Sequence, residues 1–271
     1  MLGLVKSDVW IKWNVEVSIK TVGPQNKKII IADNFYKNPN EVRNLALESN
    51  PLQNLALTQN LPGSRIFQRN TQIRKNLKPF FDNYCLDDSL WSRNIDKDMY
   101  EFQWDNVGFM CNVLNHDSVV KNTWKSIPHQ DYYEDNIPVN EQNQAFLVGS
   151  EDEDIEEDYP QFGVVIYLNT PDECAGGTNL YSYNGEMTLP CNVLDYIFND
   201  LPEDFRILDK EEQIYPTIMR WLNGDMQWKV EYQAEMVYNR CIFYETTTLH
   251  SQNIQPGMFT NYDRLNQVFF L

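Results

Sequence analysis

The sequence feature that most constrains the fold is an almost unbroken apolar run at residues 162–168, Phe-Gly-Val-Val-Ile-Tyr-Leu. A short run rich in β-branched residues predicts a strand whose two faces are both buried. Other short segments have the alternation or the composition of strands. We expect such strands at residues 8–20, 28–32, 178–183, 240–246 and 264–270. The sequence therefore predicts a mainly β fold with flanking helices, a β-sandwich or jelly roll with helices packed on one face.

Two helices are expected before the main group of strands. Asn38 suits the N-cap of the first helix, and Pro39 suits its first helical position. The second helix is expected at residues 71–84. The segment between them, residues 51–70, looks irregular, and residues 99–114 are interpreted as two strands around a turn.

Composition excludes several classes of protein. The net charge of −17 repels nucleic-acid phosphates, so a nucleic-acid partner is not expected. No run of 18 apolar residues occurs, which predicts that no helix spans a membrane, and residues 1–20 lack the apolar centre of a signal peptide. The five cysteines form no Cys-x-x-Cys motif, which argues against a zinc ribbon and a disulfide scaffold. We expect a cytoplasmic protein.

Two stretches interrupt the strand pattern and are interpreted as inserts. Residues 134–161 contain the block 151–158, in which seven of eight residues are acidic. Such a block repels itself and is typical of a solvated loop, with a metal-binding or substrate-steering lid as the alternative. Residues 186–230 have helical stretches broken by prolines, which favours an insert beside or over the sheet.

A metal site is predicted around His129 and Asp131. If their segment is a strand, side chains two residues apart point to the same face, so an imidazole and a carboxylate project together. His250 follows the core strand at residues 240–246 and would complete a 2-His-1-carboxylate triad, which leaves sites open on Fe(II). The alternative is an exposed loop histidine beside a solvated aspartate. The third histidine, His116, is interpreted as a turn residue.

Arg264 is the fourth candidate. It alternates with Asn266, Val268 and Phe270 on one face of the last expected strand, and the apolar members of this set make that face the inward one. An inward arginine needs an anion, and its guanidinium suits a carboxylate held by two parallel hydrogen bonds. Either the carboxylate of a bound 2-oxo acid or an acidic side chain of the protein would satisfy it.

In this order, these motifs resemble the 2-oxoglutarate/Fe(II)-dependent dioxygenases. The motifs are His129-x-Asp131, the Tyr-Leu-Asn strand end at residues 167–169 with Gly-Gly-Thr at 176–178, then His250 and Arg264. The glycine-glycine-threonine turn is similar to the prolyl-hydroxylase-like branch. The opening Ile-Ala-Asp-Asn-Phe-Tyr resembles uncharacterised members in marine bacteria and their phages. The resemblance covers residues 28–271.

The resemblance implies a double-stranded β-helix (jelly roll) with Fe(II) on His129, Asp131 and His250. It implies that Arg264 binds the C5 carboxylate of the cosubstrate 2-oxoglutarate. Further candidates for cosubstrate contacts are Asn112, Tyr100 and Tyr167. The chain departs from the pattern in two places. Prolyl hydroxylases carry lysine where Arg264 stands, and many arginine-type members carry serine or threonine where Asn266 stands, so prolyl specificity is not implied.

We therefore expect one dioxygenase domain over residues 1–271, with N-terminal helical support at about 1–98 and a β-helix core at about 99–271. The expected reaction is oxygenation, with dioxygen, of a C–H bond in a protein side chain, an amino acid or a small metabolite. The alternative is a non-catalytic binding module, or a cupin-like barrel with Mn or Zn. The sequence leaves the substrate and the oligomeric state open. A phage-encoded protein would act in the cytoplasm of the bacterial host.

Overall fold

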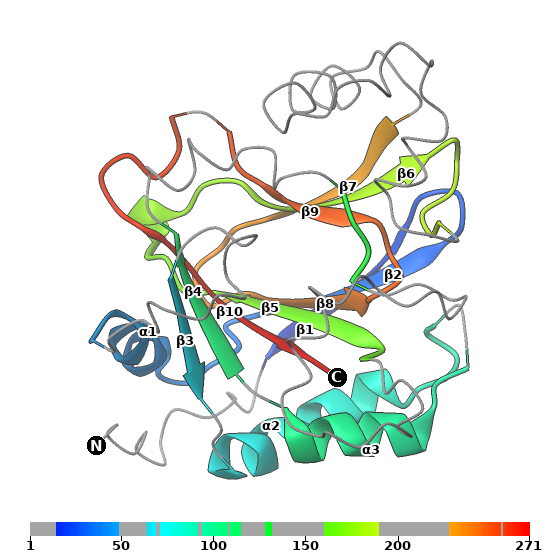
Figure 1. The fold of residues 1–271 in the computed structure, drawn as a ribbon, viewed down its shortest axis with the longest axis horizontal. Coiled ribbons are helices and arrows are strands. Elements are labelled where there is room, and N and C mark those ends of the chain that lie inside the picture. The colour runs from blue at the N-terminus through cyan, green and yellow to red at the C-terminus, as the bar shows by residue number, and fades with distance from the viewer. Residues whose placement is uncertain are drawn as a thin grey trace, which may run out of the picture.

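The fold is built on two antiparallel sheets that face one another (Figure 1). The structure is a computed structural model, and it describes residues 15–48, 64–68, 71–91, 94–107, 109–114, 128–131, 160–189, 228–255 and 257–271. The larger sheet has seven strands in the order β1-β2-β8-β5-β10-β4-β3, and the smaller has three in the order β7-β6-β9. The expectation of a mainly β fold with helices is confirmed at this level.

The strands are short, and the three α-helices all precede β4 in the chain. The strands are β1 Glu16–Val22, β2 Lys27–Asp33, β3 Ser64–Gln68, β4 Phe109–Leu114, β5 Phe162–Tyr167, β6 Gly177–Tyr183, β7 Trp228–Glu235, β8 Cys241–Glu245, β9 His250–Asn253 and β10 Arg264–Phe270. The helices are α1 Pro39–Glu48, α2 Thr71–Cys85 and α3 Lys97–Asn106, with a 3₁₀ turn at Pro171–Glu173. No helix among the described residues combines the length and the apolar character needed to span a bilayer.

Strand β5 lies at the centre of the seven-stranded sheet and explains the unbroken apolar run. Every one of its residues is buried, because each face packs on a separate hydrophobic cluster. Val164 and Ile166 point to the helices, which cover the outer face of the sheet (Figure 1). Val165 and Tyr167 point into the space between the sheets, where they meet residues of β6 and β8. With both faces covered, the sequence of such a strand has no polar alternation.

Three further predicted elements are confirmed. Strand β2 is buried between β1 and β8, α1 begins at Pro39, and β10 covers the predicted 264–270. Strands β1 and β2 extend the same sheet as β8 and β5.

Two expectations about secondary structure before residue 115 are wrong. Residues 99–106 belong to helix α3, whereas a strand was expected, because Tyr100, Phe102 and Trp104 alternate with polar residues as they would in a strand. In the helix Phe102 is 42% exposed while Gln103 is 7% exposed, so the burial follows the helical period. The Asp96 side chain caps this helix by accepting a hydrogen bond from the Met99 N–H at 3.0 Å.

The second error concerns residues 51–70, which were expected to be irregular. Residues 64–68 form β3, an edge strand that pairs only with β4 in the sheet. Two predicted features lie outside the described residues: the acidic block 151–158 and most of the insert at 186–230.

Candidate metal centre

The structure brings His129, Asp131 and His250 together. One ligand atom of each side chain lies within 4.8 Å of those of the other two. His250 Nε2 is 3.3 Å from Asp131 Oδ2, and His129 Nε2 is 3.8 Å from Asp131 Oδ1. The three atoms thus converge on one point from which a cation would reach all of them.

The backbone explains how two distant segments deliver this arrangement. The His129 N–H donates to the His250 carbonyl at 2.8 Å, and the His250 N–H donates back to the His129 carbonyl at 2.8 Å. This reciprocal pair is an antiparallel bridge, which places residues 128–131 beside β9 in Figure 1. The Asp131 N–H donates to the Thr246 carbonyl at 3.0 Å. Both ends of the His-x-Asp segment are therefore tied to the chain that leads into β9.

Gln130 holds the same segment from its other face. Its side chain donates to the Leu189 carbonyl at 3.1 Å and accepts from the Leu189 N–H at 2.5 Å. The predicted alternation is seen here: Gln130 points away while its two neighbours point to the centre. Within residues 128–131 the structure has a single bridge, where a strand was expected.

The hydrogen bonding of His250 orients it as a ligand. Its Nδ1 lies 2.9 Å from the Thr248 carbonyl, which can only accept, so Nδ1 carries the proton. In the neutral ring the lone pair then lies on Nε2, the atom that faces Asp131. A backbone carbonyl that fixes the tautomer in this way is a common feature of metal-binding histidines.

Electrostatics favours an ionised carboxylate at the centre. Burial alone would raise the pKa of Asp131, but the charge and the hydrogen bond of His250, together with His129, outweigh burial and lower that pKa below its usual value. Burial would likewise lower the pKa of His250, and the Asp131 carboxylate raises it. An ionised aspartate beside two imidazoles is the donor set of a divalent transition metal.

The centre is open on one side. The His129 side chain is 46% exposed, whereas Asp131 and His250 are largely covered. The described residues offer three protein ligands here, a number that would leave coordination positions free for small molecules, unlike the four protein ligands of a structural zinc site.

Arg264 is a buried cation without an acidic partner among the described residues. Its exposure is 4%, its Nη1 donates to Asn266 Oδ1 at 2.7 Å, and its Nε has no hydrogen-bond partner. Burial lowers the pKa of the guanidinium, and the nearby Tyr167 and Tyr244 oppose that shift. Of the two partners expected from the sequence, the acidic side chain is therefore not found in the part of the chain that is described.

Two buried tyrosines lie near Arg264, and one of them, Tyr244, also lies near the metal centre. Tyr167 is opposite Asn266 in the β5–β10 ladder, and its hydroxyl hydrogen-bonds with Thr178 Oγ1 at 2.7 Å. The ring of Tyr244 lies beside that of His250, with 4.8 Å between ring centroids and 56° between ring planes, and Asp131, Tyr167 and Arg264 all influence its pKa. Burial is the main reason that this pKa is raised.

Sequence reasoning missed Tyr244. Its side chain is almost fully buried, with 2% exposure. The available signal was its alternation with Ile242 on the strand that leads to His250, because both side chains face the interior between the sheets. Tyr244 is thus a buried polar group close to His250 and Asp131.

The other two candidates for cosubstrate contacts are Tyr100 and Asn112. Tyr100 lies on α3 in the cluster on the helix side of the sheet, where its hydroxyl donates to Asp82 at 3.1 Å. The structure does not bring it to the metal centre, because its segment is a helix and the sheet stands between. Asn112 lies in β4 opposite Asn266, but its side chain is outside the described residues, as is His116.

Comparisons with known proteins give a family without an assigned activity. Residues 122–266 match the family of unknown function DUF6445, a match that spans the three residues of the centre and Arg264. No curated protein matches the chain. Among solved structures, an N-substituted L-amino acid dioxygenase from Burkholderia ambifaria AMMD in complex with alpha-KG covers 90% of this chain and 81% of its own. Its identity is 9% and its TM-score 0.34, a likeness too low to carry an argument.

Proposed function

This chain belongs to the family of unknown function DUF6445, and we propose that it is a 2-oxoglutarate- and Fe(II)-dependent oxygenase. In this proposal the two facing antiparallel sheets form a double-stranded β-helix. His129, Asp131 and His250 hold the iron, and the positions that they leave free take 2-oxoglutarate and dioxygen.

The observation that carries the proposal is the buried guanidinium of Arg264. A charge taken out of water is costly unless an anion compensates it, and no described carboxylate does so. A dicarboxylate that chelates the metal at one end would place its second carboxylate at a distance from the metal, where such a cation is needed. A simple metal-binding module has no use for this cation.

Each residue has a defined role in this scheme. The iron and its cosubstrate supply the oxidising chemistry. Neutral His129 and His250 and ionised Asp131 hold the metal, and the Thr248 carbonyl keeps His250 in the tautomer that binds. The guanidinium fork of Arg264 orients the cosubstrate through its far carboxylate.

The substrate enters the proposal only as a class. The exposed face of His129 is the side of the centre that solvent reaches. We propose that a protein side chain, an amino acid or a small metabolite approaches from there and is oxidised at a C–H bond. The net charge of −17 makes a nucleic acid an unfavourable partner.

Metal and cosubstrate binding test the proposal directly. The purified chain should bind one Fe(II) per molecule without oxygen and, once loaded, should bind 2-oxoglutarate. His129→Ala should weaken iron binding at least 100-fold, because it removes one of three ligands. His116→Ala, which removes a histidine outside the triad, is the matched control. Unchanged iron affinity in His129→Ala would overturn the ligand assignment.

Turnover separates an oxygenase from a binding module. With iron, 2-oxoglutarate and oxygen, the wild-type chain should release succinate slowly even without substrate, and Arg264→Met should reduce that rate. A chain that prefers Mn or Zn and binds no 2-oxoglutarate would support the binding module.

A further inference from the structure

Asn169 lies directly beyond the end of the ladder that positions Arg264. Strand β5 pairs with β10 as far as the Tyr167–Asn266 pair, and the Leu168 N–H still donates to the Leu265 carbonyl at 3.1 Å. After that point the backbone of β5 turns away. The residue that would stand opposite Arg264 in a longer ladder is Asn169.

The side chain of Asn169 continues the ladder in place of the backbone. Its Oδ1 accepts a hydrogen bond from the Leu265 N–H at 2.7 Å, and its Nδ2 donates to the Asp263 carbonyl at 2.8 Å. These are the two residues on either side of Arg264. The amide is 1% exposed, so neither bond can be replaced by bulk water.

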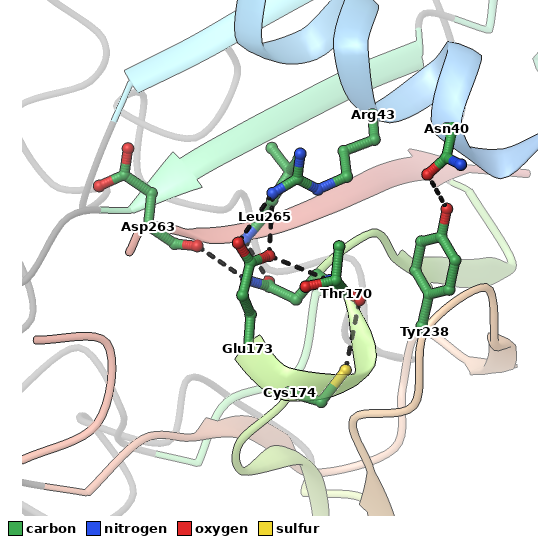
Figure 2. Close-up of polar contacts among 9 residues, drawn as sticks. Asn40, Arg43, Thr170, Glu173, Cys174, Tyr238, Asp263 and Leu265 are labelled. Atoms are coloured by element: carbon green, nitrogen blue, oxygen red, sulfur yellow. Dashed lines mark hydrogen bonds and ion pairs between the residues drawn. The ribbon is translucent and has the colours of Figure 1, made fainter. Parts of the chain in front are cut away.

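Asn169 is itself firmly anchored by the turn that follows it. Its carbonyl accepts a hydrogen bond from Cys174 Sγ at 3.3 Å. Glu173 accepts the Thr170 N–H at 3.0 Å, and both of its oxygens lie 2.9 Å from Arg43 Nη2 on α1 (Figure 2). Figure 2 also shows Asp263 and Leu265 beside this turn. The first strand residue of β10 is thus held by a rigid turn that is fixed to a helix.

We infer that Asn169 is a positioning residue that aims the Arg264 guanidinium at the far carboxylate of the cosubstrate. This inference rests on the proposed function. Among the described residues, the Arg264 side chain donates one hydrogen bond, to Asn266, so its direction depends on where its backbone lies. Loss of either Asn169 bond frees the backbone on one side of Arg264 and moves the guanidinium relative to the metal.

A matched pair of substitutions tests the inference. Asn169→Asp keeps the acceptor for Leu265 and removes the donor to Asp263. Asn239 is a buried amide with the same two roles, since it accepts the Tyr36 N–H at 2.8 Å and donates to the Tyr36 carbonyl at 2.8 Å. Asn239→Asp therefore removes an equivalent side-chain bond that does not join the residues on either side of Arg264.

The measurement is the affinity of the iron-loaded chain, without oxygen, for 2-oxoglutarate and for 2-oxobutyrate, which lacks the far carboxylate. Asn169→Asp should weaken 2-oxoglutarate about tenfold, as the loss of a buried hydrogen bond implies, and leave 2-oxobutyrate and iron unchanged. Asn239→Asp should lower the melting temperature similarly and leave the ratio of the two affinities unchanged. In an Arg264→Met background, Asn169→Asp should have no further effect on the ratio.

The outcomes separate the two hypotheses. A wild-type chain that does not prefer 2-oxoglutarate over 2-oxobutyrate refutes the proposed function, and the role of Asn169 falls with it. A wild-type chain with that preference, together with an Asn169→Asp variant that retains it, refutes only the positioning role. The same loss of preference in Asn239→Asp would also refute it, because a general loosening of the fold would then be the cause.

Discussion

Replacing Arg264 with methionine should leave the ligand-free protein about as stable as the wild type, although it destroys cosubstrate binding. The guanidinium is buried, has an unpartnered Nε and has no acidic partner among the described residues. Methionine has a similar length and flexibility, so it fills the same volume without a charge. The substitution therefore isolates the cost of keeping a cation in this position.

The expected magnitude follows from two opposing contributions. Burying an ion costs several kcal/mol after relaxation of the protein, and exchange of buried ionic groups for apolar ones is often stabilising by about 1–4 kcal/mol. The variant also leaves Asn266 Oδ1 without its donor, at 2.7 Å in the wild type, which costs about 1–3 kcal/mol. These two ranges combine to a change in the free energy of unfolding between about 2 kcal/mol lower and about 3 kcal/mol higher, centred close to zero.

Chemical unfolding of the metal-free wild type and variant measures the effect on stability. Unfolding of the iron-loaded chains with and without cosubstrate measures the effect on binding. At a concentration 100 times its dissociation constant, 2-oxoglutarate should stabilise the iron-loaded wild type by about 2.7 kcal/mol. The same concentration should not stabilise Arg264→Met measurably. A metal-free variant less stable than the wild type by more than about 2 kcal/mol would refute the reasoning, because the guanidinium would then have a structural partner.

Three other substitutions are informative. Gly163→Ala should have little effect on iron binding, because a Cβ at this position lies 3.4 Å from Asp131 Oδ2, an ordinary contact. Gly163→Val should weaken iron binding about tenfold, because the further methyl groups of valine would displace the carboxylate. Iron titration of both variants checks these expectations. Gln130→Ala should lower the free energy of unfolding by about 1–3 kcal/mol, measured in urea, because it leaves a backbone N–H and a carbonyl without their partners. Burial raises the pKa of Glu173, but hydrogen bonds from Thr170 and the hydrogen bonds and charge of Arg43 outweigh burial and lower that pKa below its usual value. A depressed carboxyl pKa contributes stability that is present above the unfolded value and is lost as the pH falls through the folded value. The destabilisation by Glu173→Gln should therefore shrink as the pH falls below about 4.5, and an unfolding series at several pH values that shows no such trend would contradict the ion pair.

The sequence predicted every described strand that is completely buried. Residues 162–168 could be recognised because a central strand covered on both faces needs apolar residues at every position. Strand β3 could not, since an edge strand with one neighbour has no such requirement. Helix α3 was mistaken for a strand because Tyr100, Phe102 and Trp104 imitate a period of two.

The predicted site residues were those whose chemistry is rare in the sequence. The chain has 3 histidines, so His129 and His250 are candidates by residue type, and Arg264 is a candidate as a cation on an apolar strand. Their convergence was a hypothesis drawn from the expected strand positions and from the resemblance, because it depends on which strands pair. The position of Tyr244 next to His250 depends on the fold between β8 and β9, which no local pattern specifies.

Asn169 shows the same limit more clearly. Its identity was visible as the last residue of the Tyr-Leu-Asn motif, but its role depends on the register between β5 and β10. Register is a property of two strands together, and a single sequence does not state which residues stand opposite one another.

The reciprocal bridge between His129 and His250 has a consequence for folding kinetics. The two residues come from different halves of the chain, so the entropy of closing a long loop must be overcome before they meet. An ion that needs both imidazoles has no complete binding site in the transition state if this bridge forms late. Metal would then slow unfolding without accelerating refolding, and the lifetime of the folded chain would follow the supply of iron.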